Sequence, residues 1–396
     1  MKNKVENFIA DVVQTMPHSG IRKFFDLIAK TEGVISLGVG EPDYITPDLI
    51  REACIKALTE GQTKYTSNCG MPELREEIAC YLHKRFDVDY EPKQVIVTVG
   101  VSEAADLALR AIINPGDEIL IGEPCYVSYA PNTALAGGVP VAIHTRAEDN
   151  FRIKKKDLVA KITERTKAIL LSYPNNPTGA IMERADLEEI AQVAKKYNLL
   201  VISDEVYAEL TYGRKHVSIA SLPGMRARTI LLNGFSKAFA MTGWRLGFAA
   251  GPDEIIDAML KIHQYTMLCA PSISQYAALT GLKKGFPFVD EMVSEYDKRR
   301  SIIVKGLSDL GLPCFEPQGA FYVFPSIEGT GMTSEEFCEG LLFEEKVAVV
   351  PGNAFGPSGE GYIRCCYATA QNEIEEALER IQRFLNQQNI SKAAIL

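Results

Sequence analysis

Lys237 is the residue of this sequence best suited to covalent chemistry. It stands in GFSKAFAMTGWRLG (234–247) with apolar residues on both sides, so its side chain is expected to be poorly solvated. Burial lowers the pKa of a lysine, and the neutral amine is the better nucleophile and Schiff-base former. Because most lysines lie on protein surfaces, this interpretation needs support from other residues.

Asp204 and Tyr207 could supply acid and hydrogen-bond chemistry beside such an amine. Asp204 lies near the end of the apolar segment LLVISDE (199–205), where a carboxylate is costly unless it meets a cation or hydrogen-bond donors. Tyr207 follows it closely along the chain. A helix cap or a salt bridge would explain the same carboxylate without catalysis.

Groups that bind anions or donate hydrogen bonds follow two other apolar segments. QVIVTVG (94–100) leads into Val101 and Ser102, where the start of a helix offers free N–H groups to a phosphate. An ordinary turn with Ser102 as the helix N-cap would explain the same sequence. Asn176 follows KAILLSYP (167–174) in the turn-forming sequence NNPTG, and its amide would serve either a ligand or the turn.

The remaining candidates are an aromatic ring and a charged pair. Tyr126 follows EILIGEP (118–124), and a ring at that place stacks on a planar ligand or packs on the next helix. Ser236 and Arg245 flank Lys237, and the arginine is suited to hold an anion. Each residue alone has an ordinary explanation. Together they supply the parts of one site at five successive strand ends.

These groups meet only if the segments before them are strands of one sheet. Short β-branched segments alternate with longer amphipathic ones from about residue 95, the pattern of an α/β fold with a mostly parallel sheet covered by helices. Ligands of such sheets bind beyond the carboxyl ends of the strands. The predicted strands are 94–100, 118–124, 140–145, 167–174, 199–205 and 229–235.

We expect two domains. Residues 48–287 are predicted to form the large domain. Residues 288–396 contain a long charged helix, short strand-like segments and a last amphipathic helix, which indicates a smaller α+β domain. The loop-rich residues 1–47 are expected to complete this small domain.

Composition excludes several classes of protein. The 396 residues are 46% hydrophobic and 23% charged, as in ordinary globular proteins. The formal net charge of −9 disfavours nucleic acid or an anionic membrane as a partner, and no apolar stretch reaches the roughly 18 residues of a membrane span. Nine cysteines without CxxC spacing indicate reduced thiols and a cytoplasmic protein. The five histidines form no ligand pattern, so no metal site is expected.

At these motifs the sequence resembles the class I/II aminotransferases of fold type I, which depend on pyridoxal 5'-phosphate. GFSKAFAMTGWRLG matches the lysine region of that family throughout, and PNNPTG (174–179) and SDEVY (203–207) precede it in the family's order and spacing. The likeness extends from GVGEPDYITP to GYIRCCYAT, over nearly the whole chain. Within the family the chain looks most like the bacterial alanine, aromatic and N-acetyl-diaminopimelate aminotransferases.

The resemblance implies a role for each candidate. Lys237 matches the lysine that forms the Schiff base with the cofactor, and Asp204 matches the partner of its pyridine nitrogen. Tyr207 and Asn176 would hydrogen-bond the phenolic oxygen of the ring, and Tyr126 would stack on the ring. Lys237, Asp204 and Tyr207 are the expected catalytic residues. The residues that resemble the phosphate-binding set are Val101, Ser102, Ser236 and Arg245.

Substrate binding and assembly are implied in the same way. Arg364, in YIRCCYAT, resembles the clamp for the substrate α-carboxylate, whereas an internal ion pair is the alternative. Gly40 matches a loop position that closes over the substrate, and Asn176 also belongs to the implied substrate site. Tyr65 resembles a tyrosine that reaches the phosphate bound by the neighbouring subunit, which implies a homodimer with two shared sites.

The implied reaction moves an amino group from an L-amino acid to a 2-oxo acid, such as 2-oxoglutarate or pyruvate, with ping-pong kinetics. A β-lyase (carbon–sulfur lyase) of the same fold is the alternative, because motifs barely record which bond of the substrate breaks. A dinucleotide-binding oxidoreductase is rejected, since Gly38 and Gly40 are followed by Asp43 where GxGxxG requires its third glycine.

Overall fold

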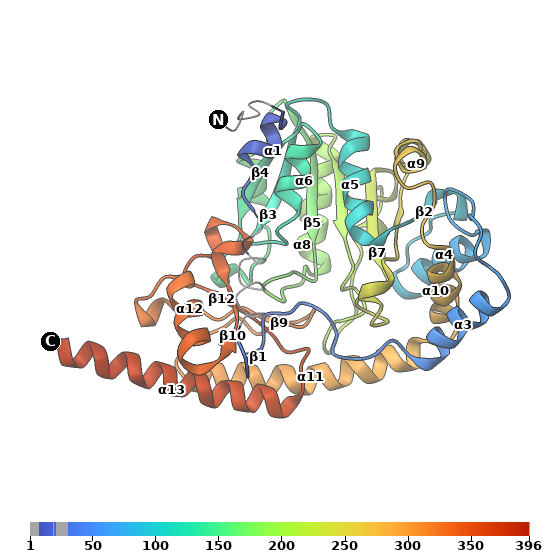
Figure 1. Cartoon of the computed structure of the whole chain (residues 1–396). Coiled ribbons are helices and arrows are strands. Elements are labelled where there is room, and N and C mark those ends of the chain that lie inside the picture. Colours follow the sequence, from blue (N-terminus) through green and yellow to red (C-terminus); the bar gives the residue numbers. More distant parts are fainter. Residues whose placement is uncertain (1–7, 19, 21–30, 396) are drawn as a thin grey trace, which may run out of the picture.

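A seven-stranded sheet forms the centre of the computed structural model, which describes residues 8–18, 20 and 31–395 and, beyond residue 388, the backbone alone (Figure 1). All its strands run parallel except β8, which is antiparallel to both of its neighbours. In spatial order the strands are β2 (Val95–Thr98), β8 (Gly247–Ala250), β7 (Thr229–Gly234), β6 (Leu200–Asp204), β5 (Thr166–Ser172), β3 (Glu118–Glu123) and β4 (Val139–His144).

The six strands predicted from the sequence are confirmed to within two residues at each end, whereas β8 was not predicted. Its sequence, GFAA, contains no β-branched residue and follows a tight turn, so nothing local marks it as a strand. The strand forms because it inserts between β2 and β7, which pair with it on both sides.

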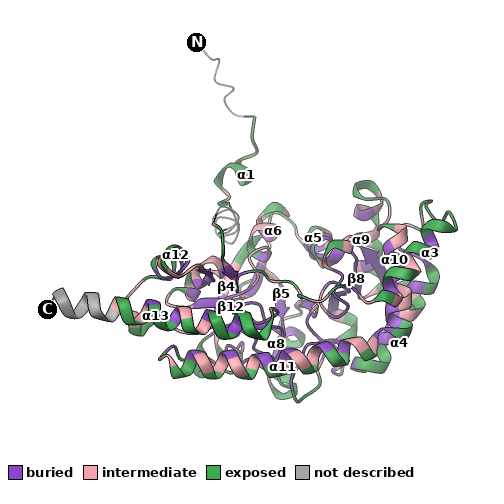
Figure 2. Cartoon of the chain, turned by 60° about the horizontal axis from the view of Figure 1, so that its bottom comes forward, coloured by how far each residue is buried: buried purple, intermediate pink, exposed green. Residues whose placement is uncertain are grey.

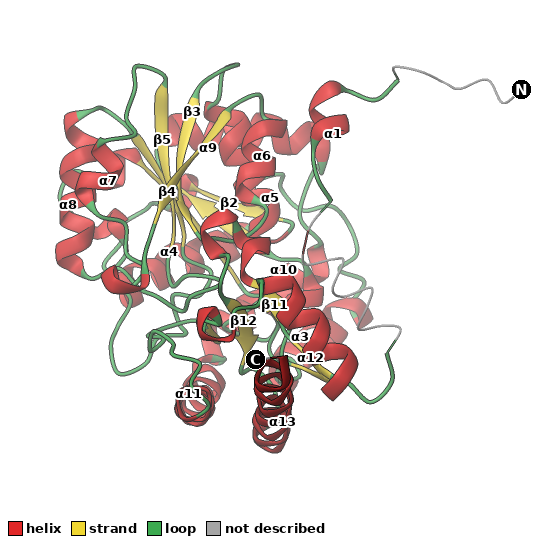
Figure 3. Cartoon of the chain, turned by 90° about the vertical axis from the view of Figure 1, so that its left-hand side faces the viewer, coloured by secondary structure: helices red, strands yellow, loops and turns green. Residues whose placement is uncertain are grey.

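Helices cover both faces of this sheet (Figure 3). The helices α5 (Gly100–Ile112), α6 (Tyr129–Leu135) and α9 (Asp253–Thr266) lie on one face, and α7 (Lys155–Val159) and α8 (Arg184–Lys196) lie on the other. In β5, Leu170 packs with the α5 side, and Ile169 and Leu171 pack with the α8 side. Since both faces are buried, the central strands are mostly apolar, as the sequence predicted.

A second group of elements lies below the carboxyl ends of these strands in Figure 1. The antiparallel strands β11 (Val350–Pro351), β12 (Ile363–Cys366) and β9 (Tyr322–Val323) form its sheet. The long helices α11 (Phe286–Asp309) and α13 (Gln371–Ile395) run side by side (Figure 2), and α12 (Ser334–Glu345) packs on α13.

The N-terminal segment joins this second group. Strand β1 (Ile35–Ser36) pairs in parallel with β10 (Val347–Ala348). Leu37 continues the pairing, since its N–H donates to Ala348 and its carbonyl accepts from Cys366. This placement brings residues 38–43 over the carboxyl ends of the large sheet.

The helices α3 (Asp48–Thr59), α4 (Pro72–Phe86) and α10 (Ser272–Lys284) gather at the end of the molecule opposite α12 (Figure 1), and the short helix α1 (Asp11–Thr15) is exposed. Helix α11 spans two cores: Val289 packs with α4 and α10, whereas Met292 and Ile303 pack with the second group. The predicted division into domains at residue 287 stays a prediction.

The mostly parallel sheet between helices, with a smaller α+β group, is the architecture that the sequence predicted. The carboxyl ends of β2, β3, β5, β6 and β7 all face the second group of elements. Any site made by residues at those ends therefore lies between the large sheet and β9, β12 and the N-terminal segment.

Candidate active site

A cavity of about 700 Å³ lies at the carboxyl ends of the strands and contains most of the predicted site. Its walls come from the large sheet, from β9 and β12, and from the N-terminal segment. The predicted residues that line it are Gly40, Val101, Ser102, Tyr126, Asn176, Asp204, Tyr207, Ser236, Lys237, Arg245 and Arg364.

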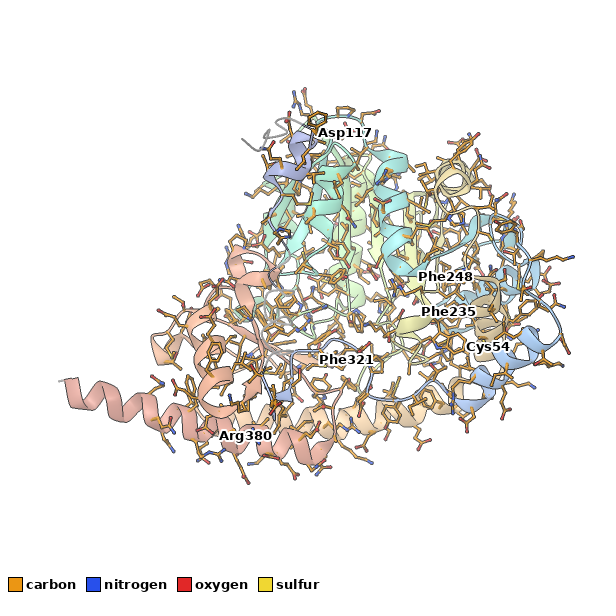
Figure 4. All side chains as sticks on the ribbon, in the orientation of Figure 1. Cys54, Asp117, Phe235, Phe248, Phe321 and Arg380 are labelled. Carbon is orange, nitrogen blue, oxygen red and sulfur yellow. The ribbon has the colours of Figure 1, made fainter. Side chains whose placement is uncertain are left out.

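Lys237 projects into this cavity from the loop after β7. Its Nζ donates a hydrogen bond to the carbonyl of Gly40 at 2.7 Å, and it lies 5.7 Å from the ring of Tyr207 and 5.6 Å from that of Phe321. Phe321 itself lies between the sheet and α11 (Figure 4). Burial among these groups lowers the pKa of Lys237 to about 8. Near neutral pH a useful fraction of this amine is therefore unprotonated and nucleophilic.

Asp204 ends β6 as a buried carboxylate. Its Oδ2 accepts a hydrogen bond from the hydroxyl of Tyr129 at 2.8 Å, and its Oδ1 accepts from the N–H of Val206 at 3.1 Å. Burial raises the pKa of Asp204 to about 6, and the Tyr129 hydrogen bond works against that rise. Both carboxylate oxygens are thus held by hydrogen bonds, and among the described residues neither forms an ion pair.

The N-terminus of α5 provides an anion-binding end. Gly100 has φ +73, and the N-cap of the helix is Val99, with no side-chain cap. The structure therefore excludes the alternative in which Ser102 caps the helix. Arg245 lies above this helix start, because its Nη2 is only 2.9 Å from where a Cβ on Gly100 would stand. Free N–H groups, a helix dipole and a guanidinium together favour a phosphate.

Arg364 lines the cavity on the β12 side and is suited to bind a carboxylate. The side chain is buried on β12, where Nη1 donates to Asn176 Oδ1 at 3.0 Å and Nη2 donates to the carbonyl of Gly38 at 2.5 Å. Within the described part of the chain its Nε has no partner, nor does it meet a carboxylate that would neutralise it. The alternative of an internal ion pair is therefore not what the structure shows.

The two asparagines of PNNPTG have separate roles. Asn175 holds the turn, since its Oδ1 accepts from the backbone N–H and the hydroxyl of Thr178. Asn176 instead faces the cavity and contacts Arg364. The sequence prediction that selected Asn176 is in agreement with this placement.

Sequence reasoning missed two tyrosines that the structure brings to the cavity. Tyr129 binds Asp204, and Tyr322 on β9 forms a hydroxyl–hydroxyl hydrogen bond of 2.8 Å with Tyr207. Tyr129 stands three residues after Tyr126 at the start of α6, and its closeness to Tyr126 in the sequence could have suggested it. Tyr322 lies in the apolar segment GAFYVFP, where an aromatic residue is indistinguishable from a core residue.

Tyr65 does not line this cavity. It is 81% exposed and borders a separate hollow of about 550 Å³ between the loop after α3, the start of α4, and α10. Within one subunit, therefore, the structure does not bring Tyr65 to the predicted phosphate position.

No group of three potential metal-binding side chains occurs among the described residues. A search of those same residues for a helix long and apolar enough to cross a membrane found none. All nine cysteines are free thiols.

A reactive lysine between a buried carboxylate and two anion-binding ends, at the edge of a mostly parallel sheet, defines an enzyme of the α/β class. Comparison with known proteins identifies its family. Residues 32–381 match the model of the aminotransferase class I and II family. The chain belongs to this family, it has the family's fold, and it is a transaminase.

Relatives and solved structures agree with this assignment over nearly the full length of the chain. The aspartate aminotransferase of Pyrococcus abyssi is 48% identical over 97% of this chain and 100% of its own, and an aromatic-amino-acid aminotransferase of Thermococcus litoralis is 45% identical over 96% and 99%. The structure of an aromatic aminotransferase from Pyrococcus horikoshii superposes with a TM-score of 0.89 at 47% identity, covering 93% of this chain and 99% of that one.

Proposed function

We propose that this transaminase binds pyridoxal 5'-phosphate and moves an amino group from an L-amino acid to a 2-oxo acid, 2-oxoglutarate or pyruvate. The observation that carries the proposal is the position of Lys237. Its amine, with a pKa lowered to about 8, lies in a cavity that also presents one buried acid and two separate anion-binding ends.

The residues present fit this cofactor. Asp204 has no cation within hydrogen-bond distance among the described residues. A protonated ring nitrogen of the cofactor would supply the opposite charge that this buried carboxylate lacks. Arg245 and the start of α5 match a phosphate, and Tyr126 presents a ring at the cavity wall. When bound, the cofactor supplies an aldehyde that condenses with amines and a ring that stabilises negative charge on the α-carbon of the amino acid.

The protein's own groups then do the proton transfer and the binding. Lys237 Nζ would take the proton from the α-carbon as a base and, as an acid, deliver it to the carbon of the cofactor that carried the aldehyde. Asp204 would keep the ring nitrogen protonated, and Tyr207 and Asn176 would donate hydrogen bonds to the phenolic oxygen.

Arg364 would bind both substrates, one after the other. The guanidinium of Arg364 faces the cavity and would hold the α-carboxylate of the amino acid and then that of the oxo acid. Because one site receives both in turn, the first product leaves before the second substrate binds, and ping-pong kinetics follow.

Among the described cavity residues the cations are Lys237, Arg245 and Arg364, and each already has a role. Donors should therefore be compared in a panel that includes aspartate and aromatic amino acids, each against 2-oxoglutarate and pyruvate. The carbon–sulfur lyase reaction has no specific observation in its favour. Release of ammonia or sulfide from amino acids alone would reveal it.

We further propose a homodimer in which Tyr65 of each subunit serves the other subunit's phosphate. The exposed position of Tyr65 supports this, as do exposed apolar side chains near it. Hydrogen bonds from Asn68 to Leu268 and from Ser272 to Lys64 hold the Tyr65 loop against the segment before α10. Exposed apolar residues lie on α3, at the end of α9 and in the loops before α4 and α10; together we call them the α3–α10 face, and they are Ile55, Leu58, Tyr65, Tyr265, Met267 and Leu268. A cytoplasmic location is proposed as well, since all nine thiols are free.

Replacement of Lys237 tests the proposed function. Incubation with pyridoxal 5'-phosphate should give the wild type a visible absorption band, and borohydride should fix the cofactor to the peptide that holds GFSK. Lys237→Ala should lose the attachment and essentially all transamination, whereas Lys93→Ala, at an exposed ion pair, should keep both. Substantial turnover by Lys237→Ala would refute the assignment.

A further inference from the structure

Tyr322 contacts both the large-sheet side and the β12 side of the cavity through two different interactions. Its hydroxyl lies 2.8 Å from the hydroxyl of Tyr207, on the large-sheet side. The face of its ring lies 4.5 Å from the guanidinium carbon of Arg364, on the β12 side. The side chain is buried, and so are both of its partners.

The surrounding structure fixes this position closely. Phe321 packs edge-on against the ring of Tyr322 and against that of Tyr207. On the other side, a Cβ on Gly40 would come within 2.6 Å of the Tyr322 hydroxyl, so the glycine there leaves room for this hydroxyl. Tyr322 also approaches the Gly40 carbonyl, at 3.4 Å, but that acceptor already receives Lys237 at 2.7 Å.

The hydrogen-bond geometry indicates which of the two tyrosine hydroxyls donates to the other. A phenol has one proton, so Tyr207 can donate to a ligand in the cavity only if the Tyr322 hydroxyl donates to Tyr207. The shorter contact favours that arrangement over donation to Gly40. Burial raises the pKa of the Tyr322 phenol and the charge of Arg364 opposes that rise, so the hydroxyl keeps its proton and remains a donor.

We propose that Tyr322 is a positioning residue of the transamination site, which aims the hydroxyl proton of Tyr207 at the phenolic oxygen of the cofactor and supports the guanidinium of Arg364. This inference rests on the proposed function. Tyr322 contributes no proton to the reaction. It acts by making Tyr207 a better donor, since each hydrogen bond in a chain polarises the next.

A spectroscopic measurement can test the first half of this proposal. A hydrogen bond to the phenolic oxygen stabilises the form of the bound cofactor that carries more negative charge, which is the form present at higher pH. Weakening the bond therefore raises the pH midpoint of the visible absorption change. Tyr322→Phe removes only the hydroxyl and should raise the midpoint by roughly 0.3 to 1 pH unit, the size of one hydrogen bond.

Two further variants separate this effect from general damage. Tyr367→Phe removes another buried hydroxyl, which donates to the carbonyl of Ala320 outside the cavity, and should leave the midpoint unchanged. Tyr207→Phe should raise the midpoint more than Tyr322→Phe does. Adding Tyr322→Phe to Tyr207→Phe should then change nothing more, because the donor that Tyr322 supports is already absent.

The role of the Tyr322 ring is tested by a separate measurement, the KM for the amino donor. Tyr322→Leu should raise the KM for the amino donor by roughly 2- to 30-fold beyond Tyr322→Phe, because it also removes the ring beneath Arg364. An unchanged midpoint in Tyr322→Phe, or an equal shift in Tyr367→Phe, would overturn the inference while the proposed function stands. A wild type that gives no visible band with pyridoxal 5'-phosphate would overturn both.

Discussion

Asp204 is placed for the proposed reaction, but the burial of its carboxyl lowers the stability of the folded protein. Its carboxyl is 6% exposed, and burial raises its pKa from 3.8 to about 6. Because the folded carboxyl keeps its proton to a higher pH than the unfolded one, its ionisation opposes folding. The cost is full above about pH 6 and vanishes below about pH 3.8, and a difference of about two pKa units corresponds to at most roughly 3 kcal/mol.

We therefore expect Asp204→Asn to raise the free energy of unfolding of the cofactor-free protein at pH 8, and to raise it by less at pH 5. The same change should lower kcat/KM of the loaded enzyme by roughly 10²-fold or more, because it leaves the ring nitrogen without its charged partner. Urea unfolding at both pH values and steady-state kinetics measure the two effects. Asp253→Asn, at an exposed ion pair, should show neither. Asp204→Asn protein that is less stable than wild type at pH 8 would contradict this account.

Individual site residues were predictable where a motif fixed their neighbours. Lys237, Asp204 and Asn176 follow recognisable strand ends, and the structure places all three in one cavity. Tyr129 and Tyr322 were not predicted, because their roles depend on contacts with residues 75 and 115 positions away along the chain. No local pattern records such a contact.

At the scale of elements, β8 is the one large-sheet strand that the sequence did not indicate, and the anion-binding end depends on it. Arg245 adopts φ +50, a conformation rare for residues other than glycine, and it turns the chain into β8. The first residue of the strand, Gly247, then passes directly beneath the start of α5. The other six strands were predictable because they are β-branched and apolar on both faces, whereas β8 is specified only by its partners.

Gly247→Ala should disturb this contact. A Cβ on Gly247 would lie 2.6 Å from both the carbonyl carbon of Gly100 and the backbone nitrogen of Val101, so the start of α5 has to move. Forcing atoms into a packed site costs about 1–3 kcal/mol, and we expect a loss of stability of that size together with weaker cofactor binding. Unfolding in urea and a cofactor titration measure both.

Gly243→Ala is the matched control, since its Cβ would meet no atom within 4 Å. It should bind the cofactor as the wild type does. Equal affinity and stability for the two alanine variants would show that the close approach of β8 to α5 does not shape the phosphate position.

At the scale of the whole molecule, the site of one subunit is incomplete if Tyr65 belongs to its partner. The α3–α10 face presents apolar side chains to solvent, and Tyr65 lies on it with 81% of its surface exposed. Exposed apolar patches of this kind commonly mark interaction surfaces. In a symmetric dimer each face would meet its copy, and each subunit would give one residue to the other's cavity.

Mixing two defective variants tests this assembly. Lys237→Ala should be inactive, and Tyr65→Phe should need more cofactor for half-maximal activity. In a mixed dimer one cavity combines an intact Lys237 with an intact Tyr65, so at low cofactor the reassociated mixture should exceed the mean activity of the separate variants. Sedimentation should show a dimer for each protein. A mixture that matches the mean, or a monomeric wild type, would count against the shared site.

The pairing of strand β1 has a consequence for the order in which the enzyme folds during synthesis. Gly38 and Gly40, which follow β1, give carbonyls to Arg364 and Lys237, whereas β1 pairs with β10 and the next residue, Leu37, accepts from the N–H of Cys366. These partners lie near the other end of the sequence, so this part of the site can take its place only after residues near position 366 have been synthesised. Shorter nascent chains therefore lack the contacts that complete the cavity.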